Sequence, residues 1–211
     1  MMRVLDLFAG LGGWSAAFRD RGHEVVTIDI DPSFKPTIIK DVMSMTAEDC
    51  AGYDIILASP PCECFSVMNI GKNWTKDNRP RNDKARAARD LALHTFDIIK
   101  PYRYVLENPR AKLRKLLPEK PRATVWYCQY GERRAKPTDI WTNLPLSFRP
   151  PCHNGAKDHD AAPRGCAVGG TMDKDTSAAE RARIPYALSL SICEQMETLM
   201  DIKQVPIEEV G

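Results

Sequence analysis

A cysteine placed behind two prolines is the residue of this chain with the clearest chemical potential. Cys62 ends the sequence Ser59-Pro60-Pro61-Cys62, which follows an apolar stretch over residues 53–58. Prolines restrict the backbone and would hold the thiol at a defined place. A buried cysteine is more often an inert small apolar residue. A cysteine in a rigid loop at the ligand-binding edge of a sheet is instead a candidate nucleophile, and we interpret Cys62 as one.

A carboxylate and two cations lie further along the chain. Residues 107–109 (Glu-Asn-Pro) follow an apolar stretch over 102–106, and Arg134 and Lys136 lie two residues apart in a segment expected to be extended. Side chains at that spacing project to the same side, so the two cations could hold a base carbonyl or a phosphate. The structural alternatives stay open: Glu107 as a helix cap before a proline at the first helical position, and the cations as an exposed basic turn.

A glycine-rich turn stands near the N-terminus. Residues 6–13 read Asp-Leu-Phe-Ala-Gly-Leu-Gly-Gly, and a helix-compatible segment follows them. Such a turn lets a ligand approach the backbone, and a helix N-terminus offers N–H groups. The run lacks the G-x-G-x-x-G spacing of dinucleotide-binding proteins, which argues against a dehydrogenase. Asp29, at the end of the next apolar stretch, would suit a ribose diol; equally, Asp29 and Asp31 would be loop caps before Pro32.

The elements that must position these residues alternate along the chain. Strand-like stretches cover residues 3–8, 24–30, 37–42, 53–58, 102–106 and 123–129; residues 14–21, 84–100 and 178–200 fit helices; and 67–83 fit a loop. This alternation predicts an α/β fold with a doubly wound, mostly parallel sheet. Ligands bind such sheets beyond the carboxyl ends of the strands. The residues named above, together with Asp41, fall at those ends, which is the main argument for an enzyme.

The composition of the chain excludes few classes of protein. The 211 residues are 43% hydrophobic and 27% charged, as in a globular protein with one main domain. The net charge of +2 is too small to argue for nucleic acid. One short stretch concentrates basic residues, which would form either a solvated face or a strip that contacts phosphates: Lys72, Lys76, Arg79, Arg81, Lys84, Arg86 and Arg89.

The chain has neither the apolar core of a signal peptide at its start nor an apolar run long enough to span a bilayer. Its seven cysteines are an odd number without disulfide-framework spacing. We therefore expect free thiols, no membrane partner and a cytoplasmic location in a bacterium or a phage-infected host.

In order, these motifs resemble those of the DNA cytosine-C5 methyltransferase family. Residues 6–13 are similar to its cofactor motif, and Pro61-Cys62 with Phe65-Ser66 is similar to its catalytic Pro-Cys-Gln-x-Phe-Ser motif. Residues 107–109 resemble its Glu-Asn-Val, and residues 134–136 resemble its Arg-x-Arg. The resemblance covers roughly residues 3–143 and is strongest to the compact phage and prophage members, some of which belong to restriction-modification systems.

The resemblance implies an S-adenosylmethionine-dependent Rossmann-like methyltransferase that acts on cytosine C5, with double-stranded DNA as its partner. Cys62 would attack C6, Glu107 would bind N3 and the amino group, and Arg134 or Lys136 would hold O2. The implied cofactor-binding residues are Phe8, Ala9, Gly10, Leu11, Gly13, Asp29, Ile30, Asp41, Val42, Ser59 and Pro61. The implied substrate-binding residues are Ser66, Asn108 and Arg133.

The chain also departs from the family pattern. Glu63 replaces the usual Gln, Pro109 replaces Val, and Lys136 replaces the second Arg and so loses its planar fork. We expect a catalytic domain over residues 1–143, a small irregular recognition region over 144–180 and a C-terminal helix within 181–211. The short recognition region leaves tRNA or a free cytosine nucleotide open as substrates, and a cofactor-binding partner subunit as another function.

Two further readings concern other chemistry. A methyltransferase of exocyclic amines would carry Asn/Asp-Pro-Pro-Tyr/Phe where this chain ends in Cys62, so the cysteine favours C5. Cys152, His153, His159 and Cys166 make a loose cluster whose spacing fits no standard zinc site, and we assign no metal ligand.

Overall fold

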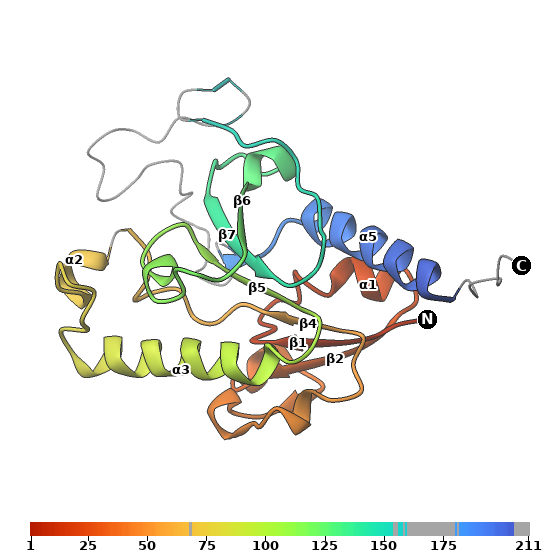
Figure 1. Cartoon of the computed structure of the whole chain (residues 1–211), viewed down its shortest axis with the longest axis horizontal. Helices are drawn as coiled ribbons and strands as arrows, with labels where there is room; N and C mark the ends of the chain where they lie inside the picture. Colours follow the sequence, from red (N-terminus) through yellow and green to blue (C-terminus); the bar gives the residue numbers. More distant parts are fainter. Residues whose placement is uncertain (68, 154–155, 158, 160–179, 181, 205–211) are drawn as a thin grey trace, which may run out of the picture.

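A mixed sheet forms the centre of the molecule (Figure 1). This computed structural model describes every residue except 68, 154–155, 158, 160–179, 181 and 205–211. In the described part the sheet has seven strands in the order β3-β2-β1-β4-β5-β7-β6. The strands are β1 (Arg3–Leu7), β2 (Glu24–Asp29), β3 (Ile38–Ile39), β4 (Ile55–Ala58), β5 (Tyr104–Pro109), β6 (Arg122–Trp126) and β7 (Pro137–Thr142). Strands β1 to β5 pair in parallel, whereas β7 runs antiparallel to β5 and β6. The predicted α/β class with a mostly parallel sheet is confirmed.

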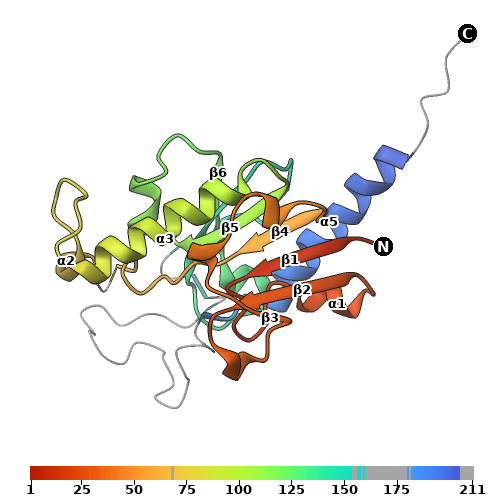
Figure 2. The ribbon, with the colours of Figure 1, turned by 90° about the horizontal axis from the view of Figure 1, so that it is seen from below.

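Helices cover both faces of this sheet. Successive strand residues point to opposite sides, and here both sets are apolar, so each face must be covered. In β4, Ile55 and Leu57 belong to the apolar cluster that includes α1 (Ala16–Asp20) and α5 (Tyr186–Gln204). Ile56 and Ala58 belong to the opposite cluster, with α3 (Asp83–Ile99). The ribbon shows α3 on one side of the strands and α1 with α5 on the other (Figures 1 and 2).

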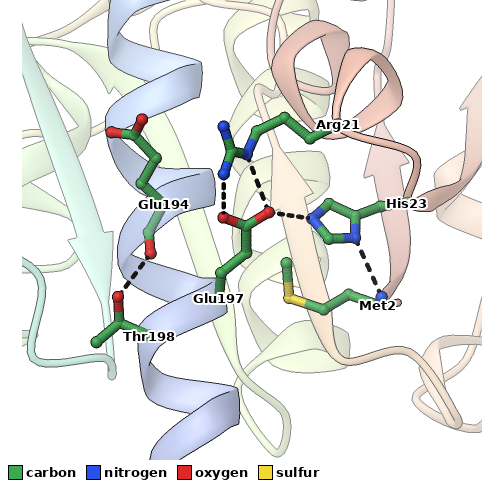
Figure 3. Close-up of polar contacts among 6 residues, drawn as sticks. All are labelled: Met2, Arg21, His23, Glu194, Glu197 and Thr198. Atoms are coloured by element: carbon green, nitrogen blue, oxygen red, sulfur yellow. Dashed lines mark hydrogen bonds and ion pairs between the residues drawn. The ribbon is translucent and has the colours of Figure 1, made fainter.

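The last helix is fastened to the N-terminal part of the chain by polar contacts (Figure 3). The Arg21 guanidinium donates from Nε and Nη2 to the two oxygens of Glu197, at 2.9 and 2.6 Å. His23 Nδ1 accepts from the backbone N–H of Met2, so its Nε2 is the donor to Glu197 Oε1 at 3.0 Å. The Arg21 hydrogen bonds lower the pKa of Glu197. Helix α5 is thereby tied to the turn between α1 and β2.

Two boundaries near the predicted site differ from the sequence-based expectation. Residues 107–109 belong to β5 rather than following it, because β7 pairs with all three in antiparallel register. Helix α1 begins only at Ala16, so the glycine-rich turn precedes the helix and does not open it. Ligand binding at this turn therefore rests on the loop backbone and its neighbours rather than on a helix N-terminus.

The segment 67–83 was expected to be a plain loop, and that expectation is wrong. It contains the short helix α2 (Ile70–Asn73), and Trp74 after it is buried. The Trp74 ring stacks on Phe65 with 5.7 Å between ring centroids, and its Nε1 donates to the carbonyl of Cys64 at 2.7 Å. One aromatic side chain therefore fixes the segment to the loop that carries Cys62.

The C-terminal helix is close to the prediction. Ile184, Leu188, Ile192 and Met196 are all buried, as expected, although α5 starts only at Tyr186. The division into segments 1–143, 144–180 and 181–211 stays a prediction, since residues 160–179 lie outside the described part. Among the residues described, none of the helices combines the length and the apolar character that a membrane crossing requires.

Candidate active site

Cys62 lies in a tight turn directly beyond β4. Its carbonyl accepts hydrogen bonds from the backbone N–H of Phe65 at 2.9 Å and of Ser66 at 3.0 Å. Phe65 is fully buried, so the turn is anchored in the core on that side. From β5, Asn108 Nδ2 donates to the carbonyl of Pro60 at 3.0 Å. The half-buried Cys62 thiol is thus presented from a backbone held at both ends, as the two prolines predict.

Glu107 is the buried carboxyl group of the site. It is 5% exposed, and Tyr127 from the 3-10 turn after β6 donates its hydroxyl to Glu107 Oε1 at 3.2 Å. The hydroxyl of Ser59 also hydrogen-bonds Glu107. Burial raises the pKa of Glu107, while the charge of Lys136 and the two hydroxyls oppose that rise. The site therefore favours a protonated carboxyl more than water does.

Lys136 is the cation that shares this space. Its Nζ lies 4.4 Å from the centroid of the Tyr127 ring, next to Glu107. Burial lowers the pKa of Lys136, while the charges of Glu107 and Cys62 act in the opposite direction. Lys136 precedes β7, and its φ of +29° lies in the left-handed region. The pairing of Pro137 with Trp126 brings Lys136 to Tyr127, whose hydroxyl contacts Glu107.

Arg134 forms an ion pair with Glu132 at 2.8 Å. Its charge lowers the pKa of Lys136, whereas Lys136 is the cation that lowers the pKa of Cys62. Arg133 is exposed. Of the predicted cations, the structure brings only Lys136 together with Cys62 and Glu107.

The ionisation of Cys62 is governed by these neighbours. Burial is the main cause that raises the pKa of the thiol, the charge of Glu107 adds to it, and the charge of Lys136 lowers it. A thiolate at Cys62 is therefore favoured when Glu107 is protonated and Lys136 is charged. Such a triad can deliver a nucleophile to an electron-poor ring, donate a proton to a ring nitrogen and hold a carbonyl oxygen.

A pocket of about 270 Å³ lies beside this triad at the ends of β1, β2 and β4. Its lining includes most of the predicted cofactor-binding residues: Phe8, Ala9, Gly10, Leu11, Gly13, Asp29, Ile30, Ser59 and Pro61. Asp29 shapes the turn, since its Oδ2 accepts from the backbone N–H of Gly10 at 2.9 Å. Gly10 has a φ of +49°, which a side chain would strain.

Further residues complete the lining of this pocket. Trp14, Phe34 and Ala182 were not predicted, whereas Arg183 and Ile184 belong to the segment 183–188, which the sequence indicated as completing a cofactor pocket before the final helix. A Cβ added at Gly13 would lie 2.8 Å from the backbone nitrogen of Ile184, so this glycine admits the segment before α5 to the wall. The resemblance in sequence gave no role to Trp14, and the aromatic Tyr127 beside Glu107 carried no motif signal.

Two predicted cofactor residues lie elsewhere among the described residues. Asp41 is exposed and caps a 3-10 turn by accepting from the backbone N–H of Met43 at 2.9 Å, and Val42 is buried in the core. Neither lines the 270 Å³ pocket. Their assignment to the adenine stays a prediction. The pocket itself, with apolar walls, the Asp29 carboxylate and the largely exposed Ile30 at its edge, fits a nucleoside such as that of S-adenosylmethionine.

This fold and site define a methyltransferase of the Rossmann-like class. Residues 2–110 match the family model of the C-5 cytosine-specific DNA methylases, and the chain belongs to this family. S-adenosylmethionine is the methyl donor of the family, so the predicted cofactor and enzyme class are confirmed at that level.

Individual proteins that are similar to this chain are also methyltransferases by name. The chain is 28% identical over 153 residues to a probable DNA (cytosine-5)-methyltransferase of Frog virus 3, covering 68% of this chain and 71% of the viral protein. It is 30% identical over 122 residues to the type II methyltransferase M.Bsp6I of a Bacillus species, covering 51% of this chain but only 36% of that enzyme. The solved structure of the Entamoeba histolytica methyltransferase EhMeth has the same fold, with a TM-score of 0.50 at 15% identity over 71% of this chain and 55% of EhMeth.

Proposed function

We propose that this protein transfers a methyl group from S-adenosylmethionine to C5 of cytosine in double-stranded DNA, through a covalent bond between Cys62 and C6 of the base. The observation that carries the proposal is the grouping of the Cys62 thiol, the buried Glu107 carboxyl and the Lys136 ammonium. Glu107 and Lys136 both affect the pKa of Cys62, and they affect the pKa of each other. Family membership supports cytosine as the base and DNA as its carrier.

The steps follow from these three groups. After Cys62 has lost its proton to solvent, the thiolate sulfur bonds to C6, and the electron pair of the C5–C6 bond moves into the ring. The protonated Glu107 donates its proton to N3, and Lys136 holds O2, so that the charge developing on the ring is stabilised. When bound, S-adenosylmethionine supplies an electrophilic methyl group. Once C5 is methylated, water removes the C5 proton, and the electron pair of that C–H bond forms the C5–C6 double bond. The Cys62 thiolate leaves C6 with the electron pair of the S–C6 bond, and N3 returns its proton to Glu107, so the pyrimidine regains its aromatic ring.

The elements around the site support the positions of the reactants. The pocket lined by residues 8–11 and Asp29 ends at Ser59 and Pro61, which directly precede the nucleophile. A cofactor in that pocket would lie next to a base that Cys62 contacts. In a duplex the base must leave the stack to reach a buried Glu107.

Nucleoside mass spectrometry tests the reaction and its substrate. DNA and tRNA from cells that express the protein are digested beside those from cells that express Cys62→Ala. We expect new 5-methylcytosine in DNA that is absent with the variant. If 5-methylcytosine appears only in tRNA, the DNA substrate is wrong and the chemistry holds. N4-methylcytosine or N6-methyladenine instead would refute the proposed chemistry.

A further inference from the structure

Two cysteines and a histidine meet away from the proposed active site. The sulfur atoms of Cys128 and Cys152 and a ring nitrogen of His159 all lie within 4.8 Å of one another. Cys152 Sγ and His159 Nδ1 are 3.5 Å apart. In a tetrahedral zinc site with bonds of about 2.3 Å to sulfur and about 2.0–2.1 Å to nitrogen, these two ligand atoms would be roughly 3.6 Å apart. The geometry is already close to that of a metal site.

The scaffold that brings these residues together is well defined. Cys128 is buried in the 3-10 turn Tyr127–Tyr130 after β6. The segment after β7 is held against that turn through Arg149, whose backbone N–H donates to the Tyr130 hydroxyl at 2.9 Å. The Arg149 guanidinium donates to the carbonyl of Gln129 at 2.6 Å. Cys152 follows only three residues later. One ligand is therefore set in the core, and a second is delivered to it by contacts that involve no metal.

We propose that Cys128, Cys152 and His159 bind a structural zinc ion. Two thiolates and a neutral imidazole are the ligands that zinc prefers, and the two thiolate charges balance that of the ion. A water or a further side chain would take the fourth position. The sequence placed Cys152, His153, His159 and Cys166 in one loose cluster and gave no reason to include Cys128, because Cys128 lies in a different element. Cys166, also considered from the sequence, lies outside the described residues.

A second group of potential metal ligands is explained without a metal. His23, Cys193 and Glu197 are equally close together. However, both ring nitrogens of His23 have partners, and both oxygens of Glu197 receive hydrogen bonds from Arg21 (Figure 3). The imidazole and the carboxylate therefore already have hydrogen-bond partners, and this cluster holds α5 against the turn between α1 and β2.

The zinc would tie the chain after β7 to the turn that supplies Tyr127. Segments with little apolar core gain order from a metal, because the metal links parts of the chain that are distant in sequence. Here the linked segment leads into the predicted recognition region, while the turn contacts Glu107 through Tyr127. The inference does not depend on the methyl-transfer chemistry, since its readout is metal content.

Elemental analysis of the purified full-length chain tests the site. After incubation with Zn²⁺ and gel filtration, we expect about one zinc per chain. His159→Ala should lose at least tenfold in zinc affinity, whereas the matched control His153→Ala, whose ring is not part of the cluster, should keep it. Zinc-free wild-type protein, or equal zinc in the two histidine variants, would refute the proposal.

Cobalt binding provides a check that needs no variant. Co²⁺ added to the wild-type chain should give the intense thiolate-to-metal charge-transfer absorption and the visible bands of a tetrahedral thiolate site. A weak octahedral spectrum would contradict the assignment. So would peptide mapping that finds Cys128 and Cys152 joined in a disulfide, because their sulfur atoms could then not bind the metal as thiolates.

Discussion

The indole Nε1 of Trp14 donates a hydrogen bond to Ser59 Oγ at 2.6 Å. Both residues line the 270 Å³ pocket, and the Ser59 hydroxyl also hydrogen-bonds Glu107. Since the indole is only a donor, Ser59 accepts a hydrogen bond from Trp14 and donates one through its own O–H to the carboxyl group of Glu107. One hydroxyl therefore joins the wall of the proposed cofactor site to the carboxyl group proposed to bind the base.

Removing that hydroxyl should affect the proton on Glu107. The Ser59 hydrogen bond lowers the pKa of Glu107, so in Ser59→Ala this pKa should rise further. We expect kcat to fall about tenfold, which corresponds to about 1.4 kcal/mol, and the limb of the pH–rate profile that reports Glu107 to move to higher pH. Ser59→Thr, which keeps the hydroxyl, should restore both kcat and the position of this limb. A profile that is identical in Ser59→Ala and wild type would exclude this positioning role.

Lys136 and Arg134 form a matched pair for the second prediction. Lys136 lies beside Cys62 and lowers its pKa, whereas Arg134 is paired with Glu132. Lys136→Met should therefore raise the pKa of Cys62 and slow its alkylation at a fixed pH, and it should reduce kcat about 10²-fold. Arg134→Met should leave the alkylation rate nearly unchanged. Alkylation is followed on the Cys62 peptide by mass spectrometry. A larger effect of Arg134→Met than of Lys136→Met would show that Arg134, not Lys136, is the cation that acts on Cys62.

Glu107→Gln should separate thiol ionisation from catalysis. The Glu107 charge raises the pKa of Cys62, so a neutral amide lowers that pKa and speeds alkylation. Methyl transfer should nevertheless fall about 10²–10³-fold, because an amide gives no proton to N3. Both rates are measured on the same preparation. If alkylation slows in Glu107→Gln, the electrostatic account of Cys62 is incorrect.

Asp6 gives a prediction for stability. This buried carboxyl accepts from Ser15 Oγ at 2.6 Å, and burial raises its pKa from 3.8 to about 7. Because the folded state holds the proton more tightly, Asp6 lowers stability as pH rises from the unfolded pKa to the folded one, by on the order of 4 kcal/mol.

The uncharged Asp6→Asn variant should avoid that loss. Its free energy of unfolding should exceed that of the wild type by an amount that grows between about pH 4 and about pH 7 and is constant above. Urea unfolding across this range measures the difference. A gap that is independent of pH would mean that Asp6 does not titrate in this window.

The sequence was sufficient for much of the fold because apolar periodicity is local. The runs that became β1, β4 and α3 were visible in it, and the strand ends pointed to Cys62 and Glu107. The antiparallel strand β7 was missed, since its pairing with β5 is a long-range contact that leaves little pattern in the residues Pro137–Thr142.

Side-chain neighbourhoods were harder to foresee for the same reason. Tyr127 reaches Glu107 because β6 and β5 flank the same strand, and the contacts of Arg149 help to bring Cys152 to Cys128. The choice between Lys136 and Arg134 depended on tertiary neighbours, because Arg134 pairs with Glu132 whereas Lys136 lies beside Tyr127 and Glu107. Motif order pointed to the proposed reacting groups, but tertiary packing decides what surrounds them.

A trapping experiment tests the central claim most directly. In duplex DNA whose cytosines carry fluorine at C5, water has no C5 proton to remove after methyl transfer, so the bond between Cys62 and C6 should persist. With S-adenosylmethionine present, we expect a complex that survives denaturing electrophoresis, with the nucleotide on the Cys62 peptide; Cys62→Ser should form none. Absence of the complex with wild-type protein that methylates ordinary DNA, or attachment at another residue, would contradict the proposed mechanism.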